Sequence, residues 1–67
     1  MTTVNTMSPD KAIEVADALY DAAQSFNEKG EAHTVVYMEK SERAVALATS
    51  DMPEEFGWEV IAIVSKA

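Results

Sequence analysis

The sequence predicts one α+β domain over residues 1–67, with an N-terminal helix packed on a three-stranded antiparallel sheet in the order α-β-β-β. Three observations predict this layout: a long segment with helical apolar spacing, two segments rich in β-branched residues, and a final uninterrupted apolar segment. A chain of 67 residues allows a single domain. Hydrophobic residues make up 48% of it, which favours a folded chain over a disordered one.

The helix is expected over residues 9–29, because both of its ends have strong boundary signals. Ser8 suits the N-cap, Pro9 the first helical position and Asp10 the positive end of the helix dipole. Gly30 is the kind of residue that ends a helix. The stripe predicted to face the sheet, flanked by Ile13 and Tyr20, comprises Ala12, Val15, Ala16, Leu19, Ala22, Ala23 and Phe26.

Three strands are expected at about residues 32–40, 43–50 and 58–66. The first two are expected to form a hairpin, in which Lys40 pairs with Arg43 across a short turn at Ser41-Glu42. A longer and looser loop is the alternative, because the turn lacks the Asn-Gly pair of the best two-residue hairpins. This register places the larger apolar residues on one face, which we expect to meet the helix. That face comprises Thr34, Val36, Met38, Val45, Leu47 and Thr49, and the other His33, Val35, Tyr37, Ala46, Ala48 and Ser50.

The rest of the chain is predicted in less detail. Residues 51–57 are expected to form a loop, with one helical turn from Pro53 as an option. The apolar run at residues 60–64 indicates a strand that is buried on both faces or has one face awaiting a partner. At the other end, residues 1–7 either fray or pack Val4 against the sheet.

The chain is strongly acidic, with 12 acidic against 5 basic residues and a formal net charge of −7. This balance argues against direct binding to nucleic acid or to anionic membranes, and it favours basic partners. No segment reaches the roughly 18 apolar residues of a membrane span. Residues 1–7 lack the basic and apolar parts of a signal peptide. We therefore expect a cytoplasmic protein.

No signature of catalysis or of metal binding is present. The chain has no cysteine, so it has neither a disulfide nor a thiolate site. Its one histidine, His33, is expected to be a surface strand residue. Glu54 and Glu55 are adjacent in a loop, and adjacent carboxylates rarely converge on one site. We expect no enzyme activity, no cofactor and no metal.

The most unusual feature is the helix face opposite the predicted stripe, where like charges recur every three or four residues. Each such pair costs roughly 0.2–0.5 kcal/mol in a helix, and a cost without a structural gain is expected where a residue has a function. We therefore predict a partner-binding surface, although a merely solvated face is the alternative. The predicted surface, which also contains Gln24, comprises Asp10, Glu14, Asp17, Asp21 and Glu28. A secondary acidic patch is predicted at Glu31, Asp51, Glu54 and Glu55.

The spacing of these carboxylates suggests nucleic-acid mimicry. Steps of three or four helical residues rise about 4.5–6 Å, a scale broadly similar to the roughly 3.4 Å per base step of DNA. In size, acidity, lack of cysteine and helix-plus-sheet layout, the chain resembles the small phage-encoded anti-CRISPR proteins, in particular those that mimic DNA and block a Cascade-type effector. The resemblance is carried by no motif and assigns no residue a role. It implies an inhibitor that occupies a DNA- or PAM-reading surface of a Cas subunit inside a bacterial host.

Two functions from different classes remain open. The first is a non-enzymatic inhibitor that binds a basic nucleic-acid-binding protein through the acidic surface. The second is a small homo-oligomeric or scaffolding domain, such as a homodimer, that uses an uncovered apolar sheet face. The residues expected on that face are Val35, Tyr37, Ala46, Ala48, Trp58, Val60 and Val64.

Overall fold

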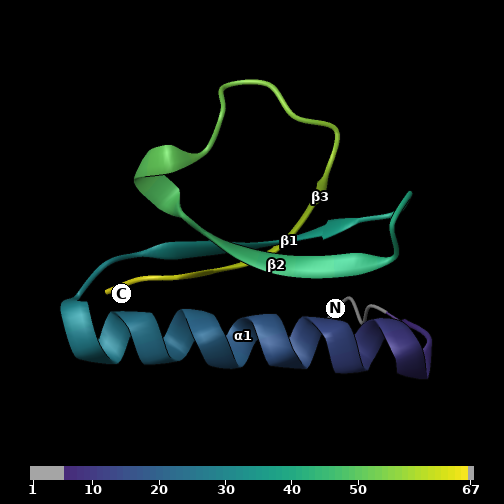
Figure 1. Cartoon of the computed structure of the whole chain (residues 1–67), viewed down its shortest axis with the longest axis horizontal. Coiled ribbons are helices and arrows are strands. Elements are labelled where there is room, and N and C mark those ends of the chain that lie inside the picture. Colours follow the sequence, from purple (N-terminus) through teal and green to yellow (C-terminus); the bar gives the residue numbers. More distant parts are fainter. Residues whose placement is uncertain (1–5, 67) are drawn as a thin grey trace, which may run out of the picture.

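The computed structural model describes residues 6–66 and confirms the predicted α+β layout (Figure 1). Val4, which the sequence analysis expects either to fray or to pack against the sheet, lies outside the described residues. The elements are the helix α1 (Pro9–Lys29), the strands β1 (His33–Met38) and β2 (Arg43–Ala48), the short 3-10 helix η1 (Thr49–Asp51) and the strand β3 (Glu59–Val64). No helix within the described residues is long and apolar enough to cross a membrane.

Both ends of α1 form where the sequence predicts them. The Ser8 hydroxyl accepts a hydrogen bond from the Lys11 backbone N–H at 3.2 Å, which satisfies one of the free amides of the first turn. At the other end Gly30 adopts a left-handed conformation with φ 69°, and its N–H donates to the Phe26 carbonyl at 2.8 Å. These local hydrogen bonds explain why the helix boundaries follow from sequence alone.

The buried side of α1 is narrower than predicted and is rotated toward Ala18. Val15, Ala18 and Ala22 are buried, and Leu19 packs against the same core from its margin. Ala16 and Ala23 were predicted to be in this stripe, but both are exposed. The core that α1 meets contains Val35 together with alanines of β2, so small residues on both elements form the contact.

The sheet has the strand order β2-β1-β3, and both pairings are antiparallel. The predicted hairpin register is wrong by two residues, because Met38, rather than Lys40, pairs with Arg43. The reason is a longer turn over residues 39–42. It contains a hydrogen bond from the Glu42 N–H to the Glu39 carbonyl at 3.3 Å, and Glu42 has a φ of 55°. The turn that forms is the looser loop, which the lack of an Asn-Gly pair had made the alternative.

The helix covers the sheet face opposite to the one predicted. The error in register does not explain this, because a shift of two residues leaves each side chain on the same face of the sheet. The strand residues that pack toward Ala18 and Ala22 are Val35, Ala44 and Ala46. Val36, predicted to meet the helix, is fully buried on the other side. There the chain from η1 to β3 arches over the sheet (Figure 1). The hydroxyls of Thr34 and Thr49, 3.0 Å apart, link this segment to β1.

The connection between β2 and β3 also differs in detail from the prediction. Its helical turn is η1 at Thr49–Asp51, before Pro53 rather than from it. The Met52 N–H donates to the Thr49 carbonyl at 3.3 Å, so this helical turn is closed within η1 and does not need the proline.

Further along the connection, Phe56 and Trp58 form a tilted aromatic pair with ring centroids 5.6 Å apart.

β3 is an edge strand that is only partly covered. Its register against β1 shifts between Val35 and Val36, so β3 contains one extra residue at this point. Ile61 and Val64 pack against the core, whereas Val60 and Ile63 are 46% and 58% exposed. The apolar run at residues 60–64 is therefore not buried on both faces.

Candidate functional site

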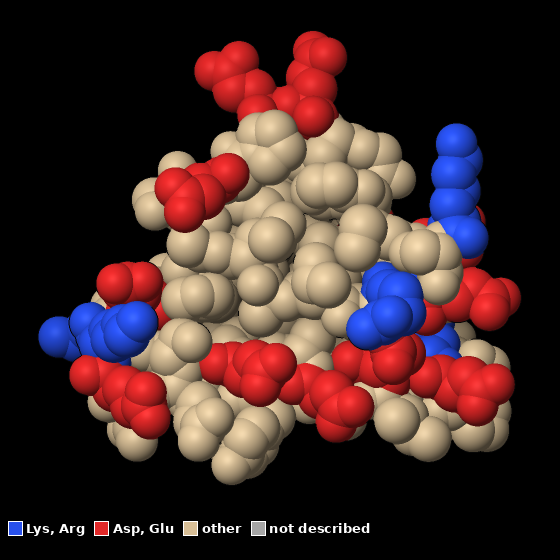
Figure 2. All heavy atoms as spheres, viewed as in Figure 1, with Lys and Arg blue, Asp and Glu red and all other residues tan. Residues whose placement is uncertain are grey.

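Five carboxylates of α1, which we call the acidic row, recur every three or four residues along most of the helix, except between Asp21 and Glu28. Figure 2 shows acidic side chains following the length of α1. Asp10, Asp17, Asp21 and Glu28 are exposed and make no ion pair with any described residue. The fifth member, Glu14, is only half-buried and behaves differently. The acidic row thus exists as a surface, but its members are not equivalent.

The acidic row lies on the flank of α1 beside β2, not directly opposite the sheet as predicted. Asp17 and Asp21 share the lining of a groove of about 360 Å³ with Ala44 and Ala46 of β2. The outermost part of α1 instead presents Ile13 and Tyr20, which are 60% and 65% exposed. The rotation toward Ala18 accounts for this, because turning Ala18 inward brings the neighbouring row of carboxylates toward β2.

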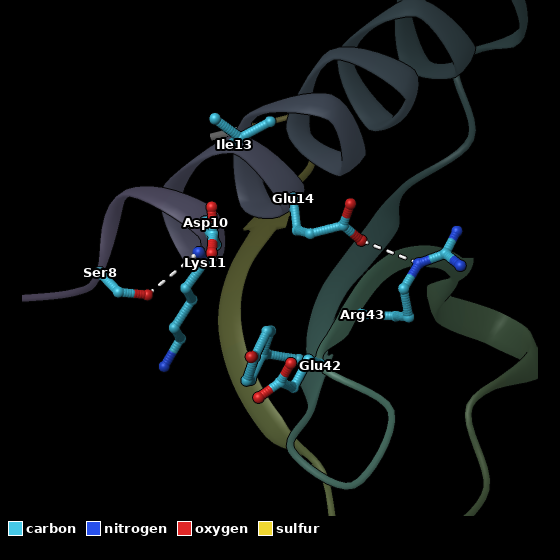
Figure 3. Close-up of a pocket in the computed structure, with 8 residues that line it drawn as sticks. Ser8, Asp10, Lys11, Ile13, Glu14, Glu42 and Arg43 are labelled. Carbon is cyan, nitrogen blue, oxygen red and sulfur yellow. Dashed lines mark hydrogen bonds and ion pairs between the residues drawn. The ribbon is translucent and has the colours of Figure 1, made fainter.

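Glu14 is neutralised by a residue that the sequence did not indicate. Its Oε1 atom lies 2.9 Å from Nε of Arg43 (Figure 3). The same atom accepts a hydrogen bond from the Ala44 backbone N–H at 3.4 Å. Glu14 was predicted to be a free charge for a partner, and the structure corrects this. The two residues are 29 positions apart, so no local sequence signal could have revealed the contact.

A second ion pair joins α1 to the other edge of the sheet, and here the helix provides the base and the strand provides the acid. Lys11 Nζ lies 2.8 Å from Glu59 Oε1 of β3 and 4.5 Å from the centre of the Tyr37 ring. The hydrogen bond to Glu59 raises the pKa of the Lys11 ammonium above its ordinary value of 10.5. Within residues 6–66, these two pairs connect the N-terminal half of α1 to β2 and to β3.

The pocket between these residues has mixed charge. It has a volume of about 360 Å³ and is lined by Asp10, Lys11, Glu14, Glu42 and Arg43, among others. Figure 3 shows the Glu14 side chain reaching from α1 toward Arg43, while Ile13 points away from Glu42. Its two bases, Lys11 and Arg43, each pair with a carboxylate across the helix–sheet junction, so the pocket does not offer the single-sign charge found on the acidic row.

The part of the predicted secondary patch at Glu54 and Glu55 does not extend the acidic row. Glu31, Asp51, Glu54 and Glu55 are all exposed. Glu54 and Glu55 lie on the segment that arches over the sheet on the side away from α1 (Figure 1), and acidic side chains form the tip of that segment (Figure 2). The structure brings Asp17 and Asp21 together on one groove and leaves these loop carboxylates apart from it.

Neither the histidine nor any carboxylate cluster forms a metal site in the described residues. His33 is half-buried, and its Nδ1 atom lies 3.0 Å from the Glu31 carbonyl. No group of three or more His, Asp or Glu side chains within residues 6–66 is arranged to hold a metal ion. No family model, curated protein or solved structure matches the chain. The candidate site therefore rests on the geometry of the acidic row alone.

Proposed function

We propose that this chain is a non-enzymatic inhibitor that binds the basic surface of a nucleic-acid-binding protein through the acidic row. The observation that supports this is the set of four exposed carboxylates on one helix that pair with no described residue, Asp10, Asp17, Asp21 and Glu28. Their mutual repulsion opposes helix formation, and Asp10 alone gains from the helix dipole. A basic partner would remove that repulsion.

The proposed mechanism is competition. A lysine- and arginine-rich groove that normally accepts phosphates would accept a row of carboxylates, and the net charge of −7 would speed the encounter. While bound, the chain would prevent nucleic acid from entering the groove. A DNA- or PAM-reading subunit of a CRISPR effector is the partner that the resemblance implies, and it belongs to this class of basic proteins.

Affinity capture followed by a displacement assay tests the proposal. The immobilised chain is exposed to a nuclease-treated bacterial lysate at low and at high salt. We expect it to retain a basic nucleic-acid-binding protein at low salt only, because charge contacts are screened by salt. The purified protein should then release labelled nucleic acid when the chain is added. Retention that is independent of salt, or a bound partner that still holds its nucleic acid, would contradict the proposal.

The second proposed function is a homo-oligomeric domain, and the structure changes which residues we propose for the contact between copies. The side chains of Val35, Tyr37 and Ala46 cannot form a sheet-face contact with a second copy, because α1 covers that face of the sheet. Val60 and Ile63 on the edge strand β3 remain exposed and favour a contact between copies. Light scattering over a range of concentrations tests it: a dimer supports this function, and a monomer at high concentration rules it out.

A further inference from the structure

The groove beside the acidic row has the unpaired edge of β2 as its second wall. β1 is the central strand, so within the described residues β2 has a hydrogen-bonding partner on one side only. The Thr49 N–H donates to the Ala32 carbonyl, and antiparallel residue pairs alternate between hydrogen-bonded and non-hydrogen-bonded. Counting back from that pair, the N–H and C=O groups of Ala44, Ala46 and Ala48 point away from β1.

The outward N–H of Ala44 already has a hydrogen-bond acceptor, which takes the place of a neighbouring strand. Glu14 Oε1 accepts the Ala44 N–H at 3.4 Å, at the place where the carbonyl of an added strand would lie. Glu14 therefore blocks the start of the edge, in the way that native sheets often protect their edges. Beyond it, no described side chain bonds to the outward amides of Ala46 and Ala48.

The spacing of the two walls of the groove is compatible with an extended strand. Asp17 and Asp21 are four residues apart, which is about 6 Å along a helix. Alternate residues of an extended strand are separated by about 6.6 Å and point to the same face. α1 and β2 run side by side in Figure 1, and both aspartates line the groove with Ala46. Alternate basic side chains on an added strand would thus meet Asp17 and Asp21 in turn.

We infer that the edge of β2 at Ala46 and Ala48 binds an extended basic segment of a partner protein as a fourth strand, with Lys or Arg at alternate positions facing Asp17 and Asp21. Backbone hydrogen bonds supply the pairing and the aspartates select basic side chains, which is the division of roles in strand addition. The inference deepens the proposed function and rests on it, because it specifies how the acidic row holds a basic partner.

Two synthetic peptides of identical composition test the inference directly. One alternates lysine with threonine, and the other has all its lysines in one block. Fluorescence anisotropy should show tighter binding of the alternating peptide, because only that peptide can pair with the edge and present every lysine to the groove. Equal binding of the two peptides would overturn the inference.

A pair of variants separates this inference from the proposed function. Ala46→Pro removes an outward N–H that β1 does not use, so it should weaken the alternating peptide about fivefold, as expected for one lost backbone hydrogen bond. It should leave the block peptide unchanged. Asp17→Asn with Asp21→Asn should weaken both peptides. Failure of the aspartate variant to weaken either peptide contradicts the proposed function, whereas failure of Ala46→Pro alone contradicts only the strand addition.

Amide hydrogen exchange on the unmodified chain provides a readout that does not depend on the folding of any variant. The alternating peptide should slow exchange of the Ala46 and Ala48 amides, because they become hydrogen-bonded. The amides of Ile61 and Ile63 on the opposite edge strand serve as the control and should exchange as before. Protection confined to the β3 amides, or none at β2, would overturn the inference.

Discussion

Glu14 of α1 and Arg43 of β2 form an ion pair of 2.9 Å, and the same carboxylate oxygen of Glu14 accepts the backbone N–H of Ala44. This contact divides the acidic row into one carboxylate that supports the fold and four that do not pair with any described residue. The division matters because truncation of the structural acid should lower stability, whereas truncation of a free acid should not.

We expect Glu14→Ala to lower the free energy of unfolding by about 0.5–1 kcal/mol, a value typical of a partly exposed ion pair. The side chains of Arg43 and Glu14 are 68% and 31% exposed, so solvent screens the pair. Asp17→Ala is the control and should leave stability unchanged or slightly raised, because it removes repulsion within α1. Urea unfolding measures both variants, and equal losses would show that Glu14 has no structural role.

Lys11 gives the fold a dependence on alkaline pH. Its pKa is raised in the folded chain by the hydrogen bond to Glu59, so its contribution to stability is complete below its ordinary value of 10.5. The contribution is lost as the pH rises through the raised value, where the ammonium loses its proton. The difference in unfolding free energy between the natural chain and Lys11→Gln should therefore shrink above pH 10.5.

The control for this effect is Lys40→Gln, since Lys40 lies exposed in the turn and makes no ion pair with described residues. Thermal unfolding at pH values on either side of 10.5 compares the three chains. A difference for Lys11→Gln that stays constant across this range would contradict the stabilising role of the Lys11–Glu59 pair.

The packing of α1 is tested by two neighbouring alanines. Ala22 is fully buried against the sheet, so Ala22→Leu should overfill the interface and cost about 1–3 kcal/mol of unfolding free energy. Ala23 is exposed, and Ala23→Leu should change stability very little. Chemical unfolding of both variants decides the orientation of the helix, because the apolar stripe predicted from sequence would make both substitutions costly.

The turn between β1 and β2 contains a residue in an unfavourable conformation. Glu42 has a φ of 55°, a left-handed conformation that costs a residue with a side chain about 1–2 kcal/mol. Glu42→Gly removes that cost but adds freedom to the unfolded chain, so we expect a net gain of about 0.5–1 kcal/mol. Ser41→Gly is the control and should be destabilising. A loss of stability in Glu42→Gly measured by urea unfolding would contradict the four-residue turn.

The parts of the fold that the sequence predicts correctly depend on neighbouring residues. Ser8 and Gly30 determine the helix ends through hydrogen bonds within one turn, and strands β1, β2 and β3 fall inside the predicted ranges. The predicted hairpin register was wrong because the register depends on the left-handed conformation of Glu42. Glutamate is not a residue type that indicates such a conformation in a turn.

The predictions of the covered sheet face and of the role of Glu14 were wrong for a different reason. Both faces of the hairpin are apolar, so their residue sizes suggested that Val36 and Leu47 meet the helix, whereas α1 packs against the smaller Ala44 and Ala46. The Glu14–Arg43 pair joins residues that are 29 positions apart, so no local sequence pattern indicates it. The acidity of the site was readable from sequence, but its groove and strand edge required the tertiary structure.

The most direct measurement of the central claim is displacement of labelled nucleic acid from the captured partner by two double variants of equal charge. Asp17→Asn with Asp21→Asn alters the acidic row, and Glu54→Gln with Glu55→Gln removes two negative charges from the loop beyond the sheet. We predict that the first variant needs about tenfold more protein for half-displacement, while the second stays within about twofold of the natural chain. Equal displacement by the two variants would contradict the claim that the helix carboxylates form the binding surface.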